Sequence, residues 1–361
     1  MLAVRERSVA ASPHEAAVRS SSQRRMLVAG PLVAAVSVVA AVLATDAAGV
    51  PLRDPDHVAG RRLLWVLALV VVLVGFDVVV RAARRTGGLR PSHAALQAVW
   101  RERWTLHRGV AVASALISFY VSYLAYRNLK SVLPLLMPGE LFDRQLADID
   151  RTLFGGNDPA ALLHTLLGTG IASHFLSFAY MLFFLFIPGT LAVALVFSSN
   201  LKAGLFYATA QSLNWLLGAA SYFMLPSLGP IYAEPSAFSN LPVSGVTQLQ
   251  DILLDQRLDF LRDPTTGTAQ SIAAFASLHV SIFFTGALAA HLLGIWRPLR
   301  IGAWILLGLT ILSTIYLGWH YVLDDLGGLI LGAMALLLAR ALTGFDLRAA
   351  RRPSAPKPAR A

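Results

Sequence analysis

Cysteine is absent from the 361 residues, so the chain can form neither disulfide bonds nor thiolate metal sites. Charged residues are also scarce, at 14%, whereas hydrophobic residues make up 56%. A water-soluble protein with so few charges would lack the polar surface needed to cover itself. The composition therefore excludes an ordinary soluble protein and indicates a protein that lies in a membrane.

Lysine is nearly absent. The chain has 27 arginines but only three lysines, which are Lys130, Lys202 and Lys357. The formal net charge is +10. A basic chain can bind nucleic acid, but the arginines here lie in the connections between apolar segments, which argues against a nucleic-acid partner. The bias toward arginine and alanine is typical of a GC-rich genome, and we expect a bacterial protein.

Apolar segments close to the length that crosses a membrane, about 20 helical residues, recur along the chain. They cover residues 26–48, 62–81, 108–126, 171–197, 203–224, 273–295, 298–317 and 320–342. We predict an all-α polytopic membrane bundle of about eight transmembrane helices. Its predicted parts are a disordered tail (1–25), two N-terminal spans with a basic loop (26–107), a catalytic six-helix domain (108–343) and a second disordered tail (344–361).

The positive charges predict how this bundle sits in the membrane. Arginines precede the first apolar segment, fill the second-to-third connection (82–107) and follow the last segment, so all three stretches share one side of an eight-helix bundle. The positive-inside rule makes that side cytoplasmic. We therefore expect both termini in the cytoplasm of a bacterial plasma membrane.

The connections on the opposite side are long. Segment 139–168 has interrupted apolar periodicity that predicts short helices at the membrane surface, and 248–262 predicts an amphipathic helix. Loops of this length usually have a function, such as covering a binding site. Trp215, Tyr222, Trp319 and Tyr321 lie near predicted helix ends and are interpreted as interface anchors.

Two short histidine motifs fall on this outer side. Ser277-Leu278-His279 and His320-Tyr321-Val322-Leu323-Asp324 each open an apolar segment, and His320 follows His279 by 41 residues. That distance is one crossing of the membrane and one return. Both histidines are therefore expected at the same face, where they can share one extracytoplasmic site.

The motifs contain groups suited to phosphoryl transfer. Asp324 lies four residues after His320, on the same side of a helix, so it can fix the tautomer of His320 and leave the other nitrogen as a nucleophile or base. Ser277 at a helix N-terminus can cap that helix or donate to a phosphate. His279 can protonate a departing oxygen.

These motifs, with Ser313-Thr314, resemble the type 2 phosphatidic acid phosphatase superfamily, most closely the inositolphosphotransferase branch that contains inositol phosphorylceramide synthases. The resemblance covers about residues 108–343. It implies that His320 forms a phospho-histidine, that Asp324 orients it, that His279 protonates the leaving group, and that neither a metal nor another cofactor takes part. It also implies a helical membrane fold with the site at the outer surface.

The chain departs from the phosphatase branch of this superfamily in its cations. The Lys-and-Arg first motif is absent, and Thr314 stands where an arginine is expected six residues before His320. A bound phosphate must then find its cations elsewhere. Lys130, Arg257 and Arg262 are candidates, although a lysine at a helix end and arginines on a solvated helix face are as readily explained by interface or solvent contact.

The expected activity is transfer of a phosphoryl headgroup, such as phosphoinositol, from a phospholipid to a lipid or polyol acceptor. The alternative within the superfamily is a lipid phosphate or polyprenyl pyrophosphate phosphatase, in which water is the acceptor. A zinc site that includes His164 and His174 lacks supporting carboxylates or thiols. A transporter would carry ionisable residues deep in several helices, and these helix centres have almost none.

Overall fold

A computed structural model describes residues 13–54, 60, 63–265, 269–270 and 272–350. Every regular element in this part of the chain is a helix. The elements are α1 (Pro13–Ala47), α2 (Leu63–Thr86), α3 (His93–Arg103), α4 (Leu106–Leu136), α5 (Asp143–Leu153), α6 (Pro159–Leu167), α7 (Ile171–Met181), α8 (Phe183–Leu191), η3 (Ala192–Phe197), α9 (Leu201–Met224), α10 (Pro230–Ala233), η4 (Pro235–Phe238), α11 (Gly245–Arg262), α12 (Leu278–Leu292), α13 (Arg297–Tyr316), α14 (Val322–Thr343) and α15 (Leu347–Ala350).

The predicted membrane bundle is confirmed. Within the described residues, six helical stretches are long and apolar enough to cross a membrane: Gln23–Ala47, Leu63–Thr86, Leu106–Leu136, Ile171–Phe197, Arg297–Tyr316 and Val322–Thr343. The other two predicted spans are α9, which is 24 residues long and carries several polar side chains, and the 15-residue apolar helix α12. All eight predicted segments are thus helical, but two of them differ in character from the rest.

Several predicted boundaries differ from the structure, among them the end of the third span, which was predicted at residue 126 and lies at Leu136 in α4. Helix α1 begins at Pro13, so residues 13–25 are helical where a disordered tail was expected. The predicted tail 344–361 is also wrong at its start, because Phe345 is buried and Leu347–Ala350 form α15. Residues 1–12 and 351–361 of the predicted tails lie outside the described residues. The sixth predicted span begins at Leu278 rather than at residue 273. The amides of Phe275 and Ala276 donate to the side chains of Ser227 and Ser221, which keeps this stretch out of the helix.

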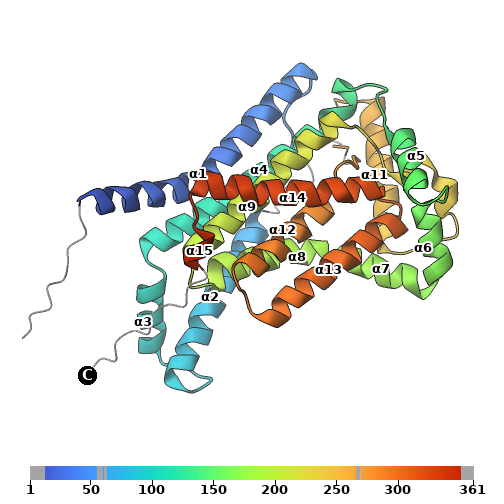
Figure 1. Ribbon diagram of the computed structural model, residues 1–361. Coiled ribbons are helices and arrows are strands. Elements are labelled where there is room, and N and C mark those ends of the chain that lie inside the picture. The colour runs from blue at the N-terminus through green and yellow to red at the C-terminus, as the bar shows by residue number, and fades with distance from the viewer. Residues whose placement is uncertain (1–12, 55–59, 61–62, 266–268, 271, 351–361) are drawn as a thin grey trace, which may run out of the picture.

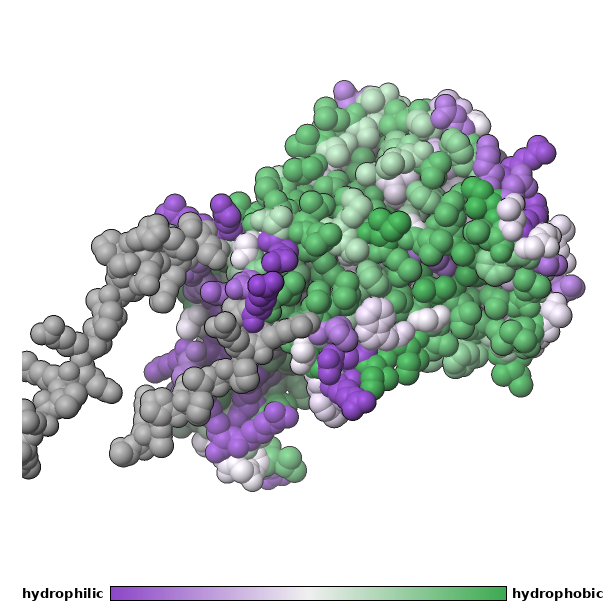
Figure 2. Space-filling model, in the orientation of Figure 1, coloured by the Kyte–Doolittle hydropathy of each residue, from purple (hydrophilic) through white to green (hydrophobic). Residues whose placement is uncertain are grey.

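The two ends of the bundle differ in what covers them. In Figure 1, α5, α6 and α11 lie together at one end, and α3 and α15 lie near the other. Hydrophilic residues gather at the two ends of the surface in Figure 2, and a broad hydrophobic band lies between them. The predicted surface helices in 139–168 and 248–262 are therefore present, as α5, α6 and α11.

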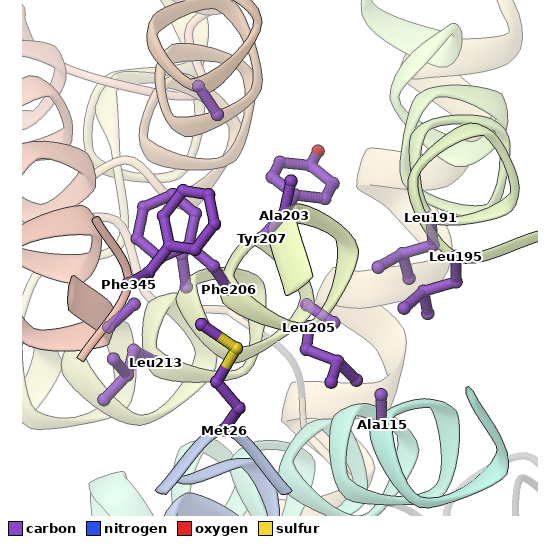
Figure 3. Close-up of a cluster of buried hydrophobic side chains, with 14 of the residues drawn as sticks. Met26, Ala115, Leu191, Leu195, Ala203, Leu205, Phe206, Tyr207, Leu213 and Phe345 are labelled. Atoms are coloured by element: carbon purple, nitrogen blue, oxygen red, sulfur yellow. The ribbon is translucent and has the colours of Figure 1, made fainter. Parts of the chain in front are cut away.

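Helix α9 forms the centre of the bundle. All of its residues from Ala203 to Trp215 are buried, and it packs against α1, α4, α12 and α14. Figure 3 shows part of this core, where Phe206 stacks on Phe345 with ring centroids 4.8 Å apart. Helix α2, in contrast, lies at the outside of the bundle, because only 11% of its most apolar 18-residue stretch is buried.

Helices α12 and α14 approach each other at Gly328 and Gly332, because small residues permit close helix packing. A Cβ atom on Gly328 would lie 2.4 Å from the Ser277 carbonyl oxygen, and one on Gly332 would lie 2.8 Å from that of Ser281. Neither glycine can be enlarged without moving a backbone. This contact sets the start of α14 beside the start of α12.

The arginines near α3 have a structural role besides marking one side of the membrane. Arg81, Arg103 and Arg108 donate to backbone carbonyl oxygens of residues 195–198, where the helical stretch α7–α8–η3 ends. Asp77 of α2 pairs with Arg81 and Arg103. Cations at a helix C-terminus satisfy its orphan carbonyls and its dipole. This cluster therefore ties α2 and α3 to the end of η3.

Candidate active site

Both motif histidines line one cavity of about 430 Å³ at the end of the bundle that carries α5, α6 and α11. Most of its wall is aromatic or aliphatic. The wall residues come from α4, α7, α8, α9, α10, α11 and α12 and from the connections after α9, before α12 and before α14. The ring centroids of His279 and His320 are 6.3 Å apart. The two histidine motifs therefore lie at the same end of the bundle, as predicted.

Asp324 contacts His320 as the four-residue spacing predicts. The Asp324 Oδ2 atom lies 3.3 Å from Nδ1 of His320 and accepts the Tyr321 amide at 2.9 Å. The second contact caps α14 in the manner of a capping box. The Asp324 carboxylate thus caps α14 and also contacts the imidazole of His320, which lies in the turn before that helix.

His320 lies in the turn between α13 and α14 and is 6% exposed. The pKa of His320 is lowered from 6.5 to about 3, mainly by burial and also by the nearby Lys130 ammonium, although the hydrogen bond to the Ala274 backbone raises it. The imidazole is therefore neutral over the physiological pH range. A neutral ring has the lone pair that nucleophilic attack needs.

His279 is held by aromatic rings. It stacks on Tyr180 with a centroid distance of 4.5 Å, and Phe183 lies 4.0 Å from it on a tilted plane. Its Nε2 atom is buried and has no hydrogen-bond partner among the described residues. Buried polar atoms are almost always paired, so an orphan nitrogen in a cavity wall is typical of a group whose partner is a substrate.

Of the predicted cations, Lys130 lines the cavity and Arg257 lies near it. The Lys130 ammonium lies 5.2 Å and 5.8 Å from the ring centroids of Tyr222 and Tyr126. Arg257 of α11 is partly buried, which lowers its pKa, while the Asp143 carboxylate raises it. Arg262, at the end of the same helix, is exposed and pairs with Asp259. Lys130 is thus the predicted cation that lies in the cavity wall, and Arg127, which was not predicted, lines the cavity with it.

Ser277 lies behind the cavity wall. It is completely buried, its hydroxyl oxygen caps α12 by accepting the Val280 amide, and its side chain also bonds to Asp325. Its predicted contact with phosphate stays a prediction. Thr314, at the position of the absent arginine, donates to Asp325 at 2.9 Å and accepts the His320 amide at 3.2 Å through its carbonyl oxygen. Thr314 therefore stabilises the turn that carries His320, on the side away from the cavity.

Two buried carboxylates of α5 escaped the sequence analysis. Asp143 accepts the amides of Leu228 and Gly229 and the Tyr321 hydroxyl, and Asp150 accepts the Val322 amide at 2.8 Å. Burial raises the pKa of both carboxyl groups, although these hydrogen bonds lower it. They lie seven residues apart on the buried face of an otherwise amphipathic helix, and acidic residues on an apolar face were the signal for them.

The interpretation of four aromatic residues as interface anchors is wrong. Trp215, Tyr222, Trp319 and Tyr321 are all buried, at 2–8% exposure. The first three line the cavity, and Trp319 stacks on Tyr180 with planes 3° apart. A helix-end position places a side chain at membrane depth, but packing against the neighbouring helices turned these rings inward.

The alternative zinc site gains no support from geometry. His164 bonds through Nε2 to the Tyr316 carbonyl oxygen at 2.8 Å, and the side chain of His174 is exposed. Within the part of the chain that the structure describes, no three potential metal ligands gather.

Comparison with known proteins agrees with the site. A family model described as the PAP2 superfamily, the type 2 phosphatidic acid phosphatases, matches residues 144–338. This range runs from α5 through most of α14 and so includes both histidine motifs. No curated protein and no solved structure matches the chain. The match covers more than half of the sequence, and the chain belongs to the PAP2 superfamily, whose members are phosphatases and phosphotransferases.

Proposed function

We propose that this protein transfers a phosphoryl headgroup, such as phosphoinositol, from a phospholipid to a lipid or polyol acceptor through a phospho-histidine on His320. The observation that carries the proposal is the pair of imidazoles in one cavity wall, 6.3 Å apart, one of them backed by Asp324 and both near Lys130. We place the site at the extracytoplasmic face of a bacterial plasma membrane, with both termini in the cytoplasm, because the arginines gather at the other end.

The proposed reaction has two displacements at phosphorus. In the first, Nε2 of His320 attacks, the bond from phosphorus to the diacylglycerol oxygen breaks, and His279 gives that oxygen a proton. In the second, His279 takes the proton of the acceptor hydroxyl, whose oxygen attacks phosphorus and releases His320. Lys130 and Arg257 neutralise the phosphate oxygens, and Asp324 stabilises the charge that develops on His320.

The cavity wall favours transfer over hydrolysis. Aromatic and aliphatic side chains form most of it, and the amphipathic helix α11 contributes Leu249, Ile252, Leu253 and Gln256. Such a wall binds the apolar part of an acceptor lipid and reduces the access of water. The alternative is a phosphatase that acts on lipid phosphates or polyprenyl pyrophosphates, which the same two histidines would support.

The test uses the purified full-length protein in vesicles with phosphatidylinositol labelled at phosphorus, with and without an added acceptor lipid. We expect labelled acceptor to form only when the acceptor is present, and labelled protein whose label is stable in alkali and lost in acid. Release of inorganic phosphate from phosphatidic acid without headgroup transfer would instead support the phosphatase.

Variants separate the roles of the two histidines. His320→Ala should lower turnover by about 10⁴-fold or more and abolish protein labelling. His279→Ala should lower turnover by about 10²- to 10⁴-fold. His174→Ala is the matched control, because this exposed histidine lies at the same end of the bundle and should leave turnover unchanged. Normal activity of His320→Ala would disprove the covalent step.

A further inference from the structure

A second cavity, of about 410 Å³, lies at the opposite end of the bundle from the histidines. Its walls come from α8 and η3, the first turns of α9, the last turns of α12 and the first turns of α13. The volume is within the range of ligand-binding pockets. None of its lining residues lines the active-site cavity, so it is a separate site.

The wall of this second cavity is built from small and apolar residues. Gly189 and Gly302 both line it, and a Cβ atom built on either would meet no heavy atom within 4 Å. The glycines thus leave open space in which a linear apolar group can lie. Because the walls are spanning helices close to the turns 198–200 and 294–296, this space is at the depth of one leaflet, where acyl chains surround the protein.

Cations lie next to the lining residues along the chain. Lys202 follows one lining turn, and Arg297 and Arg300 flank the lining residues Pro298 and Leu299. Residues 186–206 and 286–306 contain neither aspartate nor glutamate. In the described residues none of these three cations has an acidic partner, and the Arg300 Nε atom is buried without a hydrogen-bond partner. An apolar cavity with cations beside its wall residues is complementary to an acyl chain with an anionic headgroup.

We propose that this cavity binds one acyl chain of an anionic phospholipid from the leaflet at the arginine-rich end, with the phosphate of that lipid at Lys202, Arg297 and Arg300. The site differs from that of the proposed reaction in position and in residues. Its occupancy is measured without enzymatic turnover, so the two proposals can fail independently.

The test places the purified full-length protein in phosphatidylcholine vesicles that contain a lipid with a photoactivatable diazirine on its acyl chain. The probe has either a phosphatidylglycerol or a phosphatidylcholine headgroup, and mass spectrometry of peptides locates the adducts. We expect the anionic probe to label 186–206 and 286–306 several-fold more than the neutral probe. Labelling of the lipid-facing helix α2 provides the reference for ordinary contact with bulk lipid.

Two glycines of α13 provide a matched pair of variants. Gly302→Phe fills the cavity and should reduce labelling of both segments by severalfold, whereas Gly308→Phe, on the same helix with open space at its Cβ and outside the cavity, should not. If Gly302→Phe does not fold, Gly189→Leu fills the opposite wall. The combined Lys202→Gln and Arg297→Gln changes should remove the preference for the anionic probe. Unchanged labelling in the filled variants, or equal labelling by both probes, would overturn the proposal.

Discussion

His320 has a carboxylate on one side and an ammonium nearby, and these two groups act on it in opposite ways. In the proposed reaction, the Asp324 carboxylate favours the imidazolium that forms as His320 attacks phosphorus, whereas burial and Lys130 keep the free ring neutral. A nucleophile that is neutral before the reaction and stabilised as a cation during it needs both effects. Each of them can be removed by one substitution.

Asp324→Asn should lower kcat by about 10²- to 10⁴-fold, because an amide carries no negative charge to stabilise the imidazolium. The oxygen of the asparagine can still accept the Tyr321 amide, so the cap of α14 and the midpoint of thermal unfolding should change little. The measurement is turnover beside thermal unfolding in the same vesicles. A variant that keeps wild-type kcat would show that Asp324 serves only as a helix cap.

The pH dependence tests the state of His320. Because its pKa is lowered to about 3, protonation of His320 should not reduce kcat/KM between pH 7 and pH 5. Lys130→Gln removes a charge that lowers this pKa, so the acid limb of the profile should move to higher pH, independently of any loss in binding. Lys202→Gln, at the other end of the bundle, should leave the limb in place. An unmoved limb in Lys130→Gln would contradict the assigned interaction.

Burial of the neutral ring also affects stability. The pKa of His320 in the folded protein lies below its ordinary value of 6.5, so an unfolded chain binds the proton first as the pH falls. The contribution of His320 to folding is complete above pH 6.5 and is lost as the pH falls toward 3. The same burial that prepares the nucleophile therefore makes the protein less stable in acid.

Among the elements, α5 fixes the position of the turn that carries His320. Its two carboxylates hold the turn after α9 and the first turn of α14, and the Ile231 amide joins the same regions by donating to the Gly318 carbonyl oxygen. Neither carboxylate lines the cavity that holds the two histidines. We assign them as positioning residues.

Asp150→Ala should lower kcat more than it changes KM, because the Val322 amide at the start of α14 loses its acceptor. The lost hydrogen bond in a buried place should cost about 1–3 kcal/mol of stability. Asp150→Asn restores an acceptor oxygen and should recover most of the kcat. Asp148→Ala, whose side chain is exposed beside Arg151, is the control on the same helix and should be neutral. A normal kcat in Asp150→Ala would remove the positioning role.

At the scale of the whole molecule, the two cavities lie at opposite ends of one bundle, and most of the arginines lie at the end without the histidines. The absence of cysteine makes this polarity easy to measure, since any introduced thiol is the sole reactive one. Ser239→Cys, exposed at the histidine end, should react with a membrane-impermeant thiol reagent on intact cells. Ser199→Cys, exposed in the turn before α9, should react only after the membrane is opened. The reverse pattern would invert the proposed topology.

Much of the fold was predictable because helices in a lipid environment must satisfy their own backbone, so apolar length alone marks them. The same rule failed at the start of α12. There, Ser221 and Ser227, about 50 residues earlier in the chain, supply the hydrogen bonds that keep residues 274–276 out of the helix. Partners so distant in sequence leave no periodic signal. The inward rotation of Trp215 and Trp319 has a similar cause, since only packing decides which way a ring at a helix end points.

The sequence by itself determined the membrane bundle, the shared face of His279 and His320, and the pairing of His320 with Asp324, because each follows from a fixed helical rise or period. Tertiary structure alone decided the distance between the two rings, which depends on the glycine contact between α12 and α14, and the recruitment of Asp143 and Asp150 from α5. It also decided that Lys130, rather than an arginine beside His320, lies in the cavity. Spacing along a helix fixes neighbours within one element, whereas contacts between elements depend on side-chain volume and on hydrogen bonds that no local pattern records.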